Sequence, residues 1–187
     1  MKKSKLQRIL ALLMSCILLV GATLGTQLIS SAVEDGAPEY AATIDSTNVE
    51  FGGMLHLAIK ATNNTDGGKL GIYVYEYTDD YATRELELVE PIYKTFREKT
   101  VTSHTGNEIT YFATQGIAAK DIAKDYVIVA VIDNGGEITF GQRLVYSVAR
   151  YVADRADDPG VTAEQKNLYE KLLTYGEAAD AVLNPKN

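Results

Sequence analysis

Between Thr43 and Tyr146, short apolar or alternating runs are separated by turn residues, and this pattern constrains the fold more than any other feature of the sequence. Runs of this kind, closely spaced and punctuated by Gly, Asn and Asp, are typical of antiparallel all-β domains. The sequence therefore predicts a β-sandwich over residues 41–146. Its expected strands are Thr43–Phe51, Met54–Ala61, Leu70–Thr78, Arg84–Glu90, Tyr93–Thr102, Glu108–Thr114, Tyr126–Asp133 and Glu137–Tyr146.

Two local features refine this prediction. The segment Asp133–Gly136 contains Asn-Gly, whose two residues accept positive φ, and so predicts a tight hairpin turn of a primed type. Every residue from Tyr126 to Ile132 is apolar or aromatic, whereas a strand with one solvent-exposed face would alternate apolar and polar residues. We expect this strand to be central, with one face covered by its own sandwich and the other by a further element.

The C-terminal residues 147–187 predict two helices and a short tail. Ser147 is a candidate N-cap, and the first helix is expected to stop near Asp158-Pro159-Gly160. The second helix opens at Thr162, which has the spacing of a capping box with Gln165, and runs to about Leu183. One apolar stripe on it comprises Leu168, Leu172, Tyr175, Ala179 and Val182. We expect this helical hairpin to lie on the β-domain and to supply the second cover of the central strand.

The N-terminus predicts export. Residues 1–8 are basic, Ile9–Ala22 is apolar, and Ser30-Ser31-Ala32 places small residues before a cut at Val33. Residues 1–32 are thus expected to be a signal peptide and 33–40 a flexible leader, which places the protein outside the cell or in the envelope. Two alternatives remain: Ile9–Ile29 is long enough for an uncleaved membrane anchor, and Cys16 could carry a lipid.

The net charge and the cysteine content limit the kinds of partner and of metal site that we expect. The net charge is −7, and the cations at the start of the chain precede the first acid, Glu34, so removal of a leader leaves a still more acidic protein. Nucleic acid is therefore not expected as a partner, and a membrane only if the N-terminal segment is retained. Cys16 is the one cysteine, so the exported domain is expected to fold on its apolar core, with neither disulfide nor thiolate metal site.

No catalytic motif stands out. His56 lies on an expected strand between two leucines, and His104 lies in a turn; neither has a metal-binding or catalytic spacing. The turns 63–68 and 133–137 carry oxygen-rich side chains that calcium favours, but both are explained as hairpin turns and neither has the spacing of an EF-hand loop. We expect no enzyme activity, no metal and no cofactor. The alternative is a secreted hydrolase of carbohydrate or peptidoglycan that uses two facing carboxylates.

The most suggestive side chains are tyrosines. Tyr73, Tyr75 and Tyr77 recur at every second residue and therefore project from one face of a strand, and Tyr81 follows in the turn. Such rings offer flat apolar faces with hydroxyl rims, which suit sugars or a protein partner. The alternative is that they pack against neighbouring strands. These four tyrosines are the candidate binding residues.

Two resemblances add to this interpretation. The segment Gly116–Ile122 leading to Tyr126 resembles the strand crossing of immunoglobulin-like sandwiches. From Phe112 to Leu183 the chain is similar to a module of secreted cell-surface proteins of clostridia and related gut bacteria. The motifs of that similarity are Gly116–Asp121, Asp133-Asn134-Gly135, Tyr146-Ser147-Val148 with Tyr151, and Leu172–Ala179. The family usually continues with Gln and an aromatic residue, whereas Asp180-Ala181-Val182 stands here. The resemblance implies a non-catalytic extracellular module, frequently a part of larger surface proteins. Together with the row of tyrosines, it leads us to expect a secreted or cell-surface module with a structural role or with carbohydrate or protein as its partner.

Overall fold

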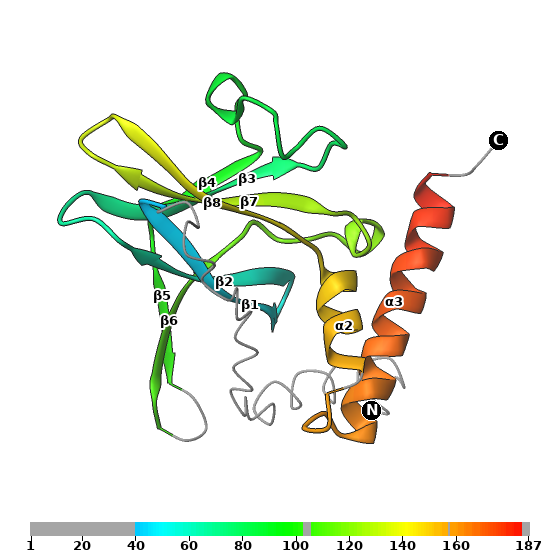
Figure 1. The fold of residues 1–187 in the computed structure, drawn as a ribbon. Coiled ribbons are helices and arrows are strands. Elements are labelled where there is room, and N and C mark those ends of the chain that lie inside the picture. The colour runs from blue at the N-terminus through cyan, green and yellow to red at the C-terminus, as the bar shows by residue number, and fades with distance from the viewer. Residues whose placement is uncertain (1–39, 103–105, 157, 185–187) are drawn as a thin grey trace, which may run out of the picture.

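The computed structural model describes residues 40–102, 106–156 and 158–184 (Figure 1). The expected signal peptide 1–32, most of the expected leader, Cys16 and His104 lie outside these ranges. In the described part of the chain, no helix is long and apolar enough to cross a membrane.

The β-domain consists of two antiparallel four-stranded sheets that pack face to face (Figure 1). One sheet has the order β1-β2-β6-β5 and the other the order β4-β3-β7-β8. Read along the chain, this is the strand order of immunoglobulin-type sandwiches with an extra strand beside the third. The predicted fold class is confirmed. The strands are β1 Ala42–Phe51, β2 Leu55–Asn63, β3 Lys69–Glu76, β4 Tyr93–Thr95, β5 Lys99–Thr102, β6 Glu108–Ala113, β7 Tyr126–Asp133 and β8 Ile138–Tyr146.

Two of the eight strand predictions were wrong. Over Arg84–Glu90 the chain forms a short 3₁₀ helix, η2 (Leu86–Leu88), in which Leu86 is buried and Leu88 is 79% exposed. A strand would have placed both leucines on one face, and this was the alternation that the sequence suggested. The expected strand Tyr93–Thr102 is divided into β4 and β5, which belong to different sheets, because the chain crosses between the sheets at this point.

The predicted hairpin between β7 and β8 is confirmed, with its turn one residue later than expected. Positive φ angles fall on Gly135 (79°) and Gly136 (106°), and not on Asn134. The backbone N–H of Asn134 donates to the carbonyl of Glu137 at 3.0 Å, which closes the loop around the two glycines. The two-glycine turn therefore fits the primed type that joins right-twisted strands.

An irregularity in each sheet joins β1 to β8. In β8 the pairing with β7 shifts at Gly141-Gln142, and in β1 the pairing with β2 shifts beside Ile44. The side-chain Oε1 of Gln142 accepts the backbone N–H of Ile44 at 2.7 Å. Bulges of this kind bend a strand and redirect a side chain. Here they bring the edges of the two sheets together.

The central strand β7 is covered on both faces, as its composition predicts. Ile128 and its alternate neighbours point into the sandwich, where they pack with Leu57, Ile59 and Phe112. Val127, Val129 and Val131 point to the outer face of the sheet and pack with Tyr75 and Leu86. The expectation that the helices cover this outer face is wrong: the segment between β3 and β5 covers it, through Leu86, Val89 and Phe96.

The helices instead extend the inner core at one end of the sandwich (Figure 1). Helix α2 (Val148–Ala156) begins after Ser147, whose Oγ accepts the backbone N–H of Arg150 at 3.1 Å. Helix α3 (Ala163–Leu183) begins with the predicted capping box of Thr162 and Gln165. Both predicted helix starts are confirmed. Each capping side chain accepts a hydrogen bond from a backbone N–H of the first turn, which has no partner within the helix.

Helix α3 packs through a face slightly different from the predicted stripe. It lies against the 3₁₀ helix η3 (Ala119–Asp121) and buries Tyr169 and Gly176, while Leu172 and Leu173 pack at the margin of the core. Tyr175 and Val182, two members of the predicted stripe, are exposed. The other three members, Leu168, Leu172 and Ala179, are half-buried, so the predicted stripe lies at the margin of the interface and not at its centre.

Candidate functional site

The structure places the four candidate tyrosines on one side of the molecule but does not make them one exposed row. Tyr73 and Tyr75 lie on the outer face of β3, and Tyr77 comes directly after the end of this strand. Tyr75 is only 2% exposed, and Tyr73 is half-buried. Tyr77 is 36% exposed and its ring centroid lies 5.4 Å from that of Tyr81. The pair Tyr77–Tyr81 is therefore what this group presents to solvent.

Aromatic packing accounts for the two inner tyrosines. The ring of Tyr73 meets Phe96 and Phe140 edge to face, each at 6.0 Å between centroids. Tyr75 is enclosed by Leu86 and Val127, and this burial raises its pKa to about 12. Edge-to-face pairs at such distances stabilise a sheet beyond the area they bury. Tyr73 and Tyr75 thus serve packing in this structure.

The Tyr77–Tyr81 pair is held in place by a turn that β8 anchors. The backbone N–H of Tyr81 donates to the carbonyl of Thr78 at 2.9 Å. Arg143, on β8, donates through Nη1 to the carbonyls of Tyr81 at 3.3 Å and Arg84 at 2.9 Å. Charge-assisted bonds to two carbonyls of one loop restrict its conformations. The position of Tyr81 is therefore set by the sheet beneath it.

Two ion pairs lie at the end of the sheet where β3 stops and β7 begins. Arg150, on α2, holds Asp125 through two parallel bonds of 2.8 and 2.7 Å. The hydrogen bonds from Asp125 are the main cause that raises the pKa of Arg150, and the Tyr77 hydroxyl contributes. Lys124 pairs with Glu76, the residue before Tyr77, at 2.6 Å and lowers the pKa of that carboxyl. Charged groups of both signs therefore lie at the end of the sheet that Tyr77 follows.

Sequence reasoning missed these polar neighbours. Arg143, Asp125 and Arg150 are distant in sequence from Tyr77, and each lies in a segment that reads as an ordinary strand, loop or helix. The one local signal was the short turn Thr78–Asp80, which returns Tyr81 to Tyr77.

The other candidate groups have structural partners. His56 is half-buried, with Nδ1 2.7 Å from the carbonyl oxygen of Thr114. In the turn 63–68, Oδ1 of Asn63 accepts the backbone N–H of Thr65, and in the turn 133–136 Oδ1 of Asp133 accepts that of Gly136. Among the described residues, no group of three or more His, Cys, Asp or Glu side chains is arranged to hold a metal.

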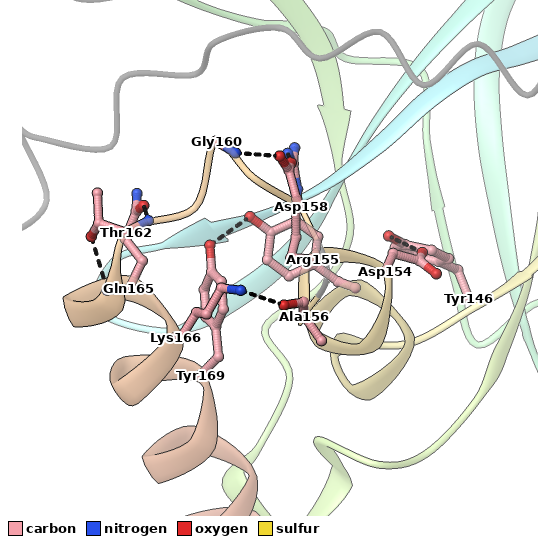
Figure 2. Close-up of polar contacts among 11 residues, drawn as sticks. Tyr146, Asp154, Arg155, Ala156, Asp158, Gly160, Thr162, Gln165, Lys166 and Tyr169 are labelled. Atoms are coloured by element: carbon pink, nitrogen blue, oxygen red, sulfur yellow. Dashed lines mark hydrogen bonds and ion pairs between the residues drawn. The ribbon is translucent and has the colours of Figure 1, made fainter.

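A polar network joins the helical hairpin to the sandwich (Figure 2). The hydroxyls of Tyr151 and Tyr169 are 3.3 Å apart in the buried interface of α2 and α3. Tyr146, at the end of β8, donates to Asp154 at 3.3 Å, and Arg155 pairs with Asp158 at 2.6 Å. These contacts link three consecutive segments, so we assign this network to the stability of the hairpin.

Alkaline pH is expected to unfold the domain through its buried phenols. Burial raises the pKa of Tyr75, Tyr126 and Tyr146 to about 12, and raises that of Tyr151 further. In the unfolded chain these groups ionise near pH 10, so the unfolded state loses protons first and stability falls as the pH rises from about 10 toward 12. Each group contributes about 1.4 kcal/mol per pH unit in that window.

Urea denaturation at a series of pH values, with phenolate absorbance followed in parallel, measures this effect. A free energy of unfolding that stays constant across the window, or a folded protein whose phenols all titrate near pH 10, would contradict it.

Neither a protein-family model, nor a curated protein, nor a solved structure matches this chain.

Proposed function

We propose that this protein is an exported, non-catalytic module that binds protein or carbohydrate at the cell exterior, and that Tyr77 and Tyr81 are its main contacts. The observation that carries the proposal is the partly exposed ring pair, 5.4 Å between centroids, on a turn that Arg143 fixes. Rings held in place lose little conformational freedom on binding, which favours affinity. The ion pairs Asp125–Arg150 and Glu76–Lys124 lie at the end of the sheet that Tyr77 follows and offer further hydrogen-bond donors and acceptors.

The sequence supports the location of this function. The basic and apolar N-terminal residues followed by Ser30-Ser31-Ala32 favour export, and the described domain contains no cysteine that would require oxidation. The immunoglobulin-type strand order with a C-terminal helical hairpin supports kinship with the surface modules of clostridia and related gut bacteria. We therefore place the protein among secreted or envelope proteins.

The test is a pull-down with three immobilised probes: purified cell-wall peptidoglycan, mucin glycans and the proteins of a culture supernatant. We expect one probe to retain the protein and the double variant Tyr77→Ala/Tyr81→Ala to bind at least about 30-fold more weakly, as for paired hot-spot residues. The control is Leu88→Ala, because Leu88 is exposed on the same covering segment and makes no part of the ring pair.

The outcomes separate the parts of the proposal. Retention of the double variant at wild-type affinity would overturn the assignment of the two tyrosines. Absence of binding to all three probes would overturn the binding role. Release of sugar or peptide fragments from the peptidoglycan would favour the hydrolase alternative.

A further inference from the structure

The tip of the β7–β8 hairpin carries an exposed asparagine that is followed by glycine. Asn134 and Gly135 are both exposed, and both lie between the two strands. Gly135 has a φ of 79°, and an added Cβ at this residue would meet nothing within 4 Å. The backbone nitrogen of Gly135 is therefore open to approach by the side chain of the residue before it.

The backbone N–H groups of this turn are engaged unequally. The N–H of Asn134 donates to the carbonyl of Glu137 at 3.0 Å, and the N–H of Gly136 donates to Oδ1 of Asp133 at 2.6 Å. Between them, the N–H of Gly135 donates to none of the residues that the structure describes. The turn thus fixes the peptide groups on either side and leaves this one nitrogen unengaged.

The side-chain amide of Asn134 makes no hydrogen bond within the described ranges of the chain. Its Oδ1 packs against the backbone of Gly68, in the turn between β2 and β3, where an added Cβ would lie 2.4 Å from it. The amide carbon Cγ and the nitrogen of the next residue can close a five-membered ring. An intramolecular attack of this kind needs no second molecule to be brought into position.

Two other asparagines show the opposite arrangement. The N–H of Asn64, which follows Asn63, donates to the carbonyl of Ala41 at 2.9 Å. The N–H of Thr65, which follows Asn64, donates to Oδ1 of Asn63 at 2.9 Å. Attack on the preceding amide by either nitrogen requires such a bond to break first, whereas the nitrogen after Asn134 has no bond of this kind to lose.

We propose that Asn134 is a site of spontaneous modification, at which the chain converts this asparagine into aspartate and isoaspartate without an enzyme. The nitrogen of Gly135 loses its proton, attacks Cγ of Asn134 and forms a C–N bond. The bond from Cγ to Nδ2 breaks, and the side-chain nitrogen leaves with a proton as ammonia. Water then opens the resulting succinimide at either of its carbonyls. The net reaction consumes one water and releases one ammonia, and it requires no other reactant.

Both products change the turn. Aspartate adds a carboxylate between Asp133 and Glu137, where like charges repel. Isoaspartate carries the chain through the former side chain and so lengthens the backbone inside the loop that the bond from residue 134 to Glu137 closes. Either product alters the contact with Gly68 in the neighbouring turn. The proposal is independent of the Tyr77–Tyr81 pair, which lies on another segment.

Peptide mapping by mass spectrometry tests the proposal on the purified exported protein, kept in neutral buffer at physiological temperature. We expect the peptide that contains Asn134 to become about 1 Da heavier with time and to separate into two products. The matched control is Asn64→Gly, which places a glycine after Asn63 while its nitrogen keeps the bond to Ala41. We expect Asn63 in this variant to react at least about tenfold more slowly than Asn134, because its attacking nitrogen is engaged.

Two variants test the chemistry at the hairpin itself. Gly135→Ala places a Cβ beside the attacking nitrogen, and we expect it to slow the reaction at least about tenfold. Because this alanine is strained at a positive φ, Asn134→Gln serves as the second variant. It keeps both glycines but has to close a larger ring, so we expect its mass to stay constant over the same period.

Four results would overturn the proposal. They are a constant mass of the Asn134 peptide, an equal rate at Asn63 in the Asn64→Gly protein, a wild-type rate in Gly135→Ala, and a mass gain that persists in Asn134→Gln.

Discussion

Gly141→Ala is expected to lower the free energy of unfolding by about 3 kcal/mol, at the upper end of the range for overpacking substitutions. A Cβ at this position would lie 2.3 Å from the carbonyl oxygen of Ala42 and 3.0 Å from that of Ala130. Both obstacles are backbone atoms of strands β1 and β7, so no side chain can rotate away. Relief requires β1 to separate from the β8 edge and to lose the bond between Gln142 and Ile44.

The matched control for this variant is Gly53→Ala. Gly53 lies in the turn between β1 and β2, and an added Cβ there meets nothing within 4 Å. We expect a change within about 0.5 kcal/mol. Thermal unfolding measures both, and the Gly141 variant should melt about 6–12 °C below wild type. Equal melting temperatures for the two variants would show that the sheets do not approach as closely as described.

Tyr169→Ala is expected to destabilise the helical hairpin by about 3–5 kcal/mol, as for other large aromatic side chains removed from a core. Tyr169 is 4% exposed and its ring meets that of Tyr151 edge to face at 5.7 Å. It is one of only two buried residues of α3, the other being Gly176, which has no side chain to contribute. Loss of this ring therefore removes the principal anchor of the helix.

Hydrogen exchange distinguishes this effect from general unfolding. We expect the amides of α3 to lose protection in Tyr169→Ala, while those of β7, buried in the middle of its sheet, keep theirs. Tyr175→Ala is the matched control, a tyrosine of the same helix that is exposed, and should change stability by less than about 0.5 kcal/mol at dilute concentration. Simultaneous loss of protection in α3 and β7 would contradict a locally anchored hairpin.

Much of the fold could be predicted because its signals are local. The all-apolar strand β7, the hairpin between β7 and β8 and the two helix caps each depend on neighbouring residues, and each is present in the structure, with the hairpin turn one residue later than predicted. The side of α3 that is buried could not be predicted in this way. Its buried side includes Gly176 and the half-buried Asp180, which score low as hydrophobic residues, so periodicity favoured the more apolar side with Tyr175 and Val182.

The candidate site was predicted only in part, for a similar reason. Period two correctly placed Tyr73 and Tyr75 on one face of β3, whereas the strand ends at Glu76, one residue before Tyr77. Which of them remains exposed depends on how the segment after β3 folds back, and there Leu86 covers Tyr75 while Leu88 points to solvent. A strand and a 3₁₀ turn share the same short alternation of Glu and Leu, so tertiary contacts decide between them.

The direction of β1 determines how the domain would respond to mechanical tension. β1 is paired with β2 from Ala42 to Phe51, and its first residue lies at the end of the sandwich away from the helices. A pull on Tyr40 along the strand would strain the whole ladder in shear, so that its bonds must fail together. A pull on Leu183 would instead peel α3 from η3 and α2 one turn at a time, so the domain would yield to a lower force at its C-terminal end.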